Sequence, residues 1–163
     1  MGNPRETLNR IATKNHQANN YWGRVIPGLG KGQFFLSLEP YYKALQQLIG
    51  APVYPGTLNL KLGRAEWACL YQNANYPIEP FVLEERRFSA VRALRVEIEG
   101  EFPGAIVFPE KGLRPGVAEI ASDRYLRDAL NLRDGDTVAF SCHCGSEPPN
   151  DGGIEKRVRA DRL

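Results

Sequence analysis

The most informative stretch of this sequence is Gly28-Leu29-Gly30-Lys31-Gly32, which Pro55-Gly56-Thr57-Leu58-Asn59 follows downstream. Three glycines at alternate positions let the backbone bend sharply and approach a ligand closely, because no Cβ atom stands in the way. Successive N–H groups in such a turn form a concave nest for phosphate oxygens. If the second run is extended, Thr57 and Asn59 share one face and offer Mg²⁺ two hard oxygen ligands. A phosphate cradle beside a magnesium site is the combination that phosphoryl transfer requires.

Neither run matches a widespread nucleotide-binding signature. A P-loop ends in Gly-Lys-Ser/Thr, whereas Gly32 is followed by Gln33 and Phe34. The dinucleotide fingerprint requires a helix at its last glycine, and no helical pattern opens at Gly32. Taken alone, the glycine run is more typical of a hairpin between two strands, Trp22–Ile26 and Gln33–Leu38. The later run, taken alone, is an ordinary start of a strand after a Pro-Gly turn.

The two runs are part of a longer pattern. Its residues are, in chain order, Gly23-Arg24-Val25, 28–38, Tyr41, Gly50, 55–62, 104–109, Glu119-Ile120, Leu126-Arg127 and 131–136. This pattern covers roughly Tyr21 to Phe140 and resembles the CTP-dependent riboflavin kinases of archaeal type. The resemblance implies an enzyme that transfers the γ-phosphoryl group of CTP to the ribityl 5′-hydroxyl of riboflavin with the help of Mg²⁺. The products of that reaction are FMN and CDP.

Short strand-like runs dominate the chain between its two ends. They are Trp22–Ile26, Gln33–Leu38, Thr57–Leu62, Ile78–Leu83, Ala90–Glu99, Ala105–Phe108 and Thr137–Ser141. The 16 glycines and 12 prolines punctuate the chain at short intervals, which favours an all-β barrel over a sheet that alternates with helices. The resemblance implies a more definite, mostly β fold. It is a compact six-stranded cradle-loop barrel, related to the RIFT barrels, with the glycine run and the Thr57 segment at its rim.

We expect two or three short helices beside these strands. The first runs from Glu39-Pro40 to about Ile49, because Pro40 suits a first helical turn and Gly50 suits a left-handed exit. The second starts near Ser122-Asp123, where either residue serves as an N-cap, and ends before Arg133. A marginal third helix is one interpretation of the N-terminal segment.

The length of 163 residues is most naturally one domain. Residues 1–20 are polar, and we interpret them as a marginal helix or a mobile arm. The kinase barrel is predicted over residues 21–144. Residues 145–163 form a predicted flexible, charged tail, because the Gly- and Pro-rich run 145–153 cannot hold regular structure.

Charge and composition set limits on partners and compartment. The net charge is only +2 and no basic stripe is present, so nothing requires a nucleic acid or an acidic membrane as partner. No apolar run approaches the length of a membrane span, and the N-terminal segment lacks the apolar centre of a secretion signal. The odd number of cysteines, three, argues against a disulfide framework. A reducing cytoplasm is the simplest compartment. The sequence is silent on the oligomeric state, for which our expectation is a monomer.

The resemblance also implies which residues form the site. The nucleotide-binding residues are Leu29, Gly30, Lys31, Gly32, Gln33 and Phe34 in the glycine run, and Arg124, Tyr125, Leu126 and Arg127 further on. The magnesium ligands are Thr57 and Asn59, and the flavin lies near Gly112 and Glu119. The residues themselves offer two candidates for a catalytic base, Glu119 and Glu39, and no motif assigns the role to either.

Spacing alone is consistent with plainer roles for three of these residues. Glu119 has the pattern of a solvent-facing acid on a barrel edge. Arg127 is equally a surface residue paired with Asp123 or Asp128, and Lys31 is equally a solvated turn residue.

The chain departs from the family pattern at Gly112, where relatives carry a flavin-contacting threonine. A hydroxyl is therefore missing on the acceptor side, although the nucleotide and metal residues are intact. Two alternatives follow: a CTP-dependent kinase of another small alcohol, and a barrel without catalytic activity that senses a nucleotide or flavin or binds DNA.

The run Cys142-His143-Cys144 is a weaker candidate for a metal site. On a strand, His143 would point to the opposite face from the two cysteines, and the core holds no partnering Cys-x-x-Cys or His pair. We expect Cys69 to be a packing residue. Trp22 and Trp67 are able to stack on a planar ring, but we expect them to be buried in the barrel.

Overall fold

The computed structural model describes residues 19–142, and the short strands in that range outnumber the helices. The strands are β1 (Asn19–Ile26), β2 (Leu58–Lys61), β3 (Tyr76–Ile78), β4 (Phe81–Leu83), β5 (Arg86–Phe88), β6 (Val91–Ile98), β7 (Phe102–Pro109), β8 (Val117–Ser122) and β9 (Thr137–Cys142). The helices are α2 (Gly32–Ser37), α3 (Glu39–Ile49), α4 (Arg64–Gln72) and α5 (Leu126–Ala129). Most of the predicted arm and all of the predicted tail, together with His143 and Cys144, lie outside the described residues.

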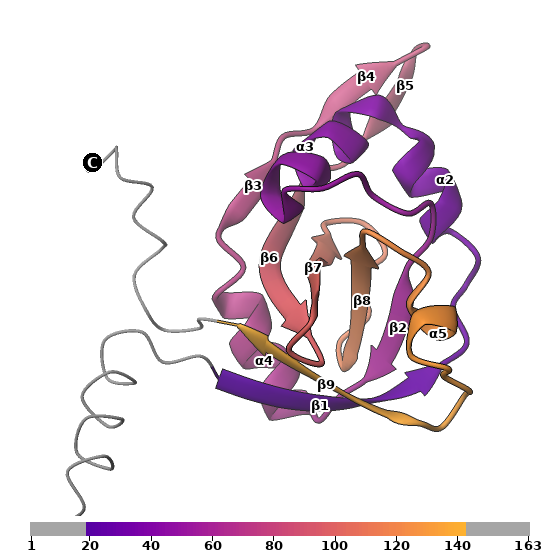
Figure 1. Cartoon of the computed structure of the whole chain (residues 1–163). Coiled ribbons are helices and arrows are strands. Elements are labelled where there is room, and N and C mark those ends of the chain that lie inside the picture. The colour runs from indigo at the N-terminus through magenta and orange to yellow at the C-terminus, as the bar shows by residue number, and fades with distance from the viewer. Residues whose placement is uncertain (1–18, 143–163) are drawn as a thin grey trace, which may run out of the picture. The chain divides into compact units, whose positions relative to one another are not determined.

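Six strands close into a barrel, as the sequence predicted (Figure 1). Around the barrel they follow the order β6, β7, β8, β2, β1 and β9, and β9 pairs back onto β6 through Glu97–Ser141 and Ile98–Phe140. The pairings of β2 with β1 and β8, and of β7 with β8 and β6, are antiparallel. β3 pairs with β6 outside this ring, and β4 and β5 form a separate hairpin.

Alternation along the strands separates the barrel interior from its surface. In β1, Tyr21 and Val25 are buried, whereas Trp22 is 63% exposed. The prediction that Trp22 is buried is therefore wrong, because it falls on the outward phase of a strand whose other phase fills the core. Trp67 is buried as expected, and its indole N–H donates to the backbone oxygen of Val117 at 2.9 Å.

The segment predicted as the strand Gln33–Leu38 is helical. Helix α2 begins at Gly32, so the glycine run leads from a strand into a helix and is not a hairpin loop. A short apolar run is compatible with a strand or a buried helix, and periodicity alone does not separate them. Tertiary packing decides here, since Leu36 and Leu38 join a core cluster with Tyr41 and Leu45 of α3.

Helix α3 has the predicted bounds, and Gly50 ends it in the left-handed conformation at φ 81°. It lies against β7 and β3 on one side of the barrel, where the hydroxyl of Tyr41 donates to the backbone oxygen of Ser89 at 2.6 Å. Helix α4 was not predicted, because its two buried residues, Trp67 and Leu70, make too narrow an apolar stripe to read from the sequence. None of the helices within residues 19–142 has the length and apolarity that crossing a bilayer requires.

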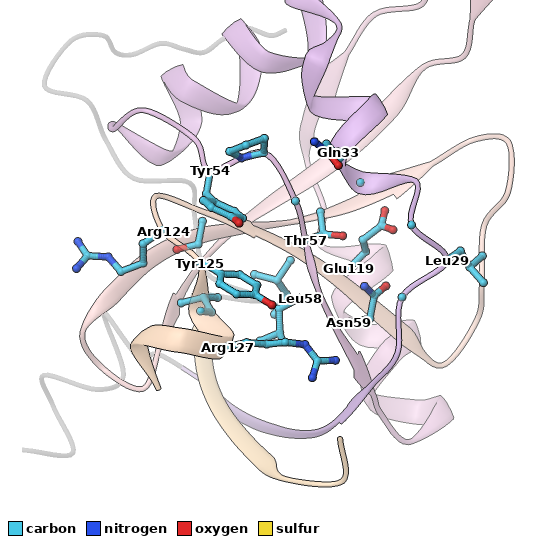
Figure 2. Close-up of a pocket in the computed structure, with 18 residues that line it drawn as sticks. Leu29, Gln33, Tyr54, Thr57, Leu58, Asn59, Glu119, Arg124, Tyr125 and Arg127 are labelled. Carbon is cyan, nitrogen blue, oxygen red and sulfur yellow. The ribbon is translucent and has the colours of Figure 1, made fainter. Parts of the chain in front are cut away.

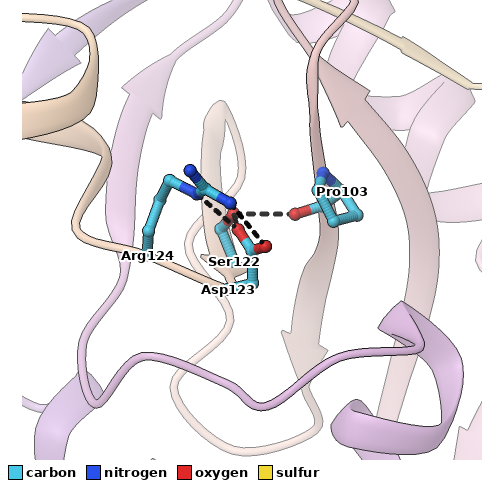
Figure 3. Close-up of polar contacts among 4 residues, drawn as sticks. All are labelled: Pro103, Ser122, Asp123 and Arg124. Atoms are coloured by element: carbon cyan, nitrogen blue, oxygen red, sulfur yellow. Dashed lines mark hydrogen bonds and ion pairs between the residues drawn. The ribbon is translucent and has the colours of Figure 1, made fainter.

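Helix α5 is shorter than predicted and starts later. Ser122, one of the predicted caps, is instead the last residue of β8, and its hydroxyl donates to the backbone oxygen of Pro103 at 2.7 Å (Figure 3). The predicted strand Ile78–Leu83 is likewise divided, because β3 ends at Ile78 and β4 begins at Phe81. Pro80 lies in the break, where a residue without an N–H group interrupts a ladder.

Truncation of an inward aromatic residue tests the strand phases. Phe140 is 1% exposed and its ring stacks on Tyr21 at 5.5 Å, so Phe140→Ala is expected to lower the free energy of unfolding by roughly 3–5 kcal/mol. Trp22→Ala removes a larger ring from the outer face and is expected to change it by about 1 kcal/mol or less. Urea denaturation followed by circular dichroism measures the free energy of unfolding of both variants. Equal losses would contradict the assignment of Phe140 to the barrel interior and Trp22 to its outer face.

Candidate functional site

A cavity of about 350 Å³ opens where the glycine run meets the barrel (Figure 2). Its lining comes from three segments that are distant in sequence: residues 28–30 with 32–33, residues 54–59, and residues 119–120 with 122 and 124–127. The two runs on which the sequence analysis depended therefore share one cavity. The volume falls within the usual range of small-molecule sites, about 300–1,000 Å³.

The glycine run lies directly on the side chains of Thr57 and Asn59. A Cβ atom added to Gly32 would stand 2.6 Å from the hydroxyl oxygen of Thr57, and one added to Gly28 would stand 2.7 Å from the amide nitrogen of Asn59. Gly30 suits its position for a different reason. Nothing lies within 4 Å of its Cβ position, but its φ of +74° is one that other residues rarely adopt. Two glycines thus permit close approach and the third permits the turn.

Strand β2 places Asn59 between two neighbouring strands. Asn59 pairs with Ile26 of β1 on one side and with Glu119 of β8 on the other. Directly opposed residues project from the same face of a sheet, so the amide of Asn59 and the carboxyl group of Glu119 lie beside each other. Figure 2 shows both grouped with Thr57 beneath Gln33.

Asn59 is 4% exposed, and an arginine binds its amide oxygen. The guanidinium Nη2 of Arg114 donates to Asn59 Oδ1 at 2.8 Å. Arg114 was not predicted as a site residue. The sequence places Arg114 two residues after Gly112, in the loop between β7 and β8, and this position was the one feature that pointed to the site. No spacing rule indicated that its side chain reaches β2.

The charge of Glu119 is balanced by burial and by two cations. Burial raises the pKa of its carboxyl group above the ordinary value, while Arg114 and, to a smaller extent, Lys31 act to lower it. The net effect is a raised pKa, which makes the carboxylate a better proton acceptor near neutral pH. Glu119 is half-buried, so the reading of it as a solvent-facing acid on an edge is wrong.

The predicted nucleotide residues of the glycine run divide into two groups. Gly30, Gly32 and Gln33 line the cavity, as does Leu29, whose side chain is turned away from it in Figure 2. Lys31 and Phe34 do not line it. Lys31 precedes α2 and is exposed, and its positive charge acts to lower the pKa of the carboxyl group of Glu119. Phe34 is 50% exposed, packs near Phe88, and lies beneath the guanidinium of Arg86.

The two predicted arginines before and within α5, Arg124 and Arg127, differ in where their guanidinium groups lie. The guanidinium of Arg124 forms two hydrogen bonds of 3.0 Å to Asp123, stands 4.7 Å from the ring centre of Phe102, and is directed away from the cavity (Figures 2 and 3). These bonds hold the pKa of Asp123 below its usual value. Arg127 donates to the backbone oxygen of Ile26 at 3.3 Å and to Asp134 at 2.8 Å.

Arg127 therefore joins α5 to the end of β1 and to the turn before β9. The partners considered from the sequence, Asp123 and Asp128, are replaced by Asp134. Because the bond to Ile26 ends at the residue just before Pro27 and Gly28, Arg127 also steadies the start of the glycine run.

Two tyrosines form an aromatic wall of the cavity. The rings of Tyr54 and Tyr125 stack at 5.2 Å with an interplanar angle of 18°, and Tyr125 remains 45% exposed. Tyr125 was predicted and Tyr54 was not. An aromatic residue directly before the Pro55-Gly56 turn was the available signal, but only the fold brings it to Tyr125.

Gly112 lines a second, much smaller hollow of about 30 Å³. Arg114, Val117 and Glu119 line it as well, so Glu119 borders both spaces. Gly112 has φ +82° and open space around its Cβ position. A β-branched residue such as threonine would be strained at this φ, so the loop conformation suits the glycine that the sequence has here.

Residues 25–142 match the family CTP-dep_RFKase, described as a domain of unknown function, DUF120. A riboflavin kinase of Aeropyrum pernix is 43% identical over 122 residues, which cover 72% of this chain and 91% of that protein. The chain belongs to the archaeal-type CTP-dependent riboflavin kinase family.

Longer members of the family are also similar to this chain. The riboflavin kinase of Thermoplasma volcanium is 38% identical over 121 residues, or 72% of this chain and 54% of its own length. That of Pyrobaculum arsenaticum is 41% identical over 120 residues, or 71% and 57%. The chain thus spans little more than half the length of these two relatives.

A double-mutant cycle tests the contact between the glycine run and β2. At the first position of a helix, Gly32→Ala would ordinarily gain up to about 1 kcal/mol of stability. Here we expect it to lose roughly 1–3 kcal/mol, because its Cβ would meet Thr57 Oγ1 at 2.6 Å. In a Thr57→Ala background the loss should shrink by at least about 0.5 kcal/mol. Stabilisation by Gly32→Ala in both backgrounds, measured by urea denaturation, would exclude the contact.

The raised pKa of Glu119 predicts a pH-dependent effect on stability. A carboxyl group whose pKa is higher in the folded state contributes stability below its unfolded pKa and loses it as the pH rises through the folded value. Glu119→Gln is therefore expected to gain stability relative to the wild type as the pH rises above about 4.5, the unfolded value. Thermal unfolding in EDTA between pH 4 and 8 measures this difference. A difference that is constant or shrinks with pH would refute it.

Proposed function

We propose that this protein is a riboflavin kinase that uses CTP and Mg²⁺, transferring the γ-phosphoryl group to the ribityl 5′-hydroxyl of riboflavin to give FMN and CDP. The observation that carries the proposal is the single cavity shared by the glycine run, Thr57 with Asn59, and Glu119. Family membership and the names of the relatives support the choice of riboflavin and CTP. The same proposal includes a cytoplasmic, monomeric protein.

The nucleotide is proposed to occupy the larger cavity. Its phosphates would lie against the backbone from Gly28 to Gln33, where the N–H groups of the first turn of α2 have no acceptor within the helix. The planar wall of Tyr54 and Tyr125 offers a surface on which a base can stack. Arg127, already bound to Asp134, has further N–H donors for a phosphate or a cytosine carbonyl.

Thr57 and Asn59 fit the proposed magnesium ion by the chemistry of their donors. Both supply neutral hard oxygens, and the carboxyl group of Glu119 lies next to Asn59. Within residues 19–142 there is no cluster of three His, Cys, Asp or Glu side chains that would hold a metal alone. The ion would therefore depend on phosphate oxygens and water for its other ligands, and when bound it would neutralise charge on the transferred phosphoryl group.

Glu119 is proposed as the proton acceptor for the attacking hydroxyl. It borders both the larger cavity and the hollow beside Gly112, which is the position that a base between donor and acceptor requires. Gly112 offers an acceptor no side-chain hydroxyl, which favours one second candidate function, the same phosphoryl transfer to another small alcohol. Most of the catalysis in either case would come from positioning and charge neutralisation.

An assay of FMN formation tests the proposal. Purified protein is incubated with Mg²⁺, riboflavin and each of the four nucleoside triphosphates in turn, and FMN is measured by chromatography with fluorescence detection. We expect FMN with CTP and little with the other three. CDP formation without FMN, with water taking the phosphoryl group as inorganic phosphate, would favour another alcohol as the natural acceptor. Nucleotide binding without any turnover would refute a kinase.

Two substitutions of Thr57 distinguish the contribution of its hydroxyl group to activity from that of its size. Thr57→Ala should lower kcat/KM for FMN formation by roughly 100-fold, about 2.7 kcal/mol, because a metal ligand is lost. Thr57→Ser keeps the hydroxyl and should retain most activity. Thr137→Ala, at an exposed position that starts β9, is the matched control and should behave as the wild type. Full activity in Thr57→Ala would remove Thr57 from the metal site.

A further inference from the structure

Arg114 is held at the site by its backbone, and its side chain reaches the proposed metal ligand. The loop from residue 110 to residue 116 joins β7 to β8, and within it the oxygen of Arg114 accepts from the N–H of Val117 at 3.0 Å. The neighbouring oxygen of Gly116 accepts from the N–H of Leu62 at 2.7 Å. These bonds fix the backbone of the turn, so the side chain is the part of Arg114 that is able to move.

The guanidinium binds the atom that a metal ion would need. Arg114 Nη2 lies 2.8 Å from Asn59 Oδ1, the hard oxygen of that side chain. The other end of the amide is enclosed by Gly28, whose Cβ position is 2.7 Å from Asn59 Nδ2. The amide is therefore held with its nitrogen toward the glycine run and its oxygen toward Arg114.

The same guanidinium compensates the neighbouring carboxyl group. Glu119 is directly opposite Asn59 in the sheet, and Arg114 has a larger electrostatic effect on it than Lys31 has. One cation thus serves both the amide oxygen and the half-buried carboxylate. A divalent cation at this place would make the same two interactions and would be repelled by the guanidinium.

We propose that Arg114 is a positioning residue that occupies the place of the divalent cation in the free protein and has to release Asn59 Oδ1 before the metal binds there. This inference rests on the proposed role of Asn59 as a metal ligand. Arg114 keeps Asn59 and Glu119 in position while no metal is present, and it weakens metal binding until a nucleotide supplies additional oxygen ligands. Metal and nucleotide therefore bind together more readily than the metal binds alone.

Metal binding by the intact chain tests this inference without any turnover. Mn²⁺, used as a probe for the metal alone, is titrated into the protein without nucleotide or riboflavin, and free Mn²⁺ is followed by electron paramagnetic resonance. Arg114→Met is expected to lower the Kd for Mn²⁺ by roughly tenfold, because it removes a cation that occupies Asn59 Oδ1 and repels the metal. Arg114→Lys keeps a cation and should stay closer to the wild type.

Arg95→Met is the matched control, because Arg95 is an exposed residue of β6 and its loss changes the net charge by the same amount. It should leave the Kd for Mn²⁺ unchanged. Thermal unfolding of each variant in EDTA establishes that it is folded, and if Arg114→Met is not, Arg114→Gln replaces it. Adding CDP should tighten Mn²⁺ binding more in the wild type than in Arg114→Met.

Three results would overturn the inference: an unchanged or higher Kd in Arg114→Met, an equal fall in Arg95→Met, or no Mn²⁺ binding in any variant. Formation of FMN by the wild type is measured in parallel. If FMN forms and the Kd does not fall, only the role of Arg114 fails. If no FMN forms with any nucleotide, the proposed function itself fails.

Discussion

The rest of the site depends on one steric constraint, the contact between the glycine run and β2. Gly28 and Gly32 allow the backbone to lie against Asn59 and Thr57 so closely that any added Cβ atom would force a neighbouring atom to shift. The contact lies where α2 begins, and it encloses the amide of Asn59 on one side. Arg114 binds the same amide from the opposite end. The cavity that follows from this arrangement is lined by the oxygen-bearing side chains of Thr57 and Asn59 and by the backbone of the glycine run.

The barrel supports this contact by holding β2 between β1 and β8. Asn59 takes its two neighbours, Ile26 and Glu119, from these strands. Arg127 then links α5 to Ile26 and so joins the third segment of the cavity to the first. The site is therefore built on strands with loops laid over them, which suits a reaction in which positioning and charge neutralisation do most of the work.

The sequence was informative where a feature is local or belongs to the pattern that resembles the family. The β barrel, α3 with its left-handed Gly50, and the meeting of two distant runs could all be predicted. Helix α2 could not, since Gln33–Leu38 has aromatic and apolar residues typical of a strand and only packing against α3 decides its conformation. Arg114 and Tyr54 could not either, because their roles depend on long-range contacts that no spacing encodes.

Above all, we propose that this cavity holds a nucleotide and a divalent cation together. The decisive experiment is a crystal structure of the protein with CDP and Mn²⁺, with anomalous diffraction recorded to locate the metal. One Mn²⁺ peak should lie within coordination distance of Thr57 Oγ1 and Asn59 Oδ1, with the diphosphate against residues 28–33 and the base near Tyr54 and Tyr125. CDP bound elsewhere, or a metal peak away from β2, would refute the proposed site.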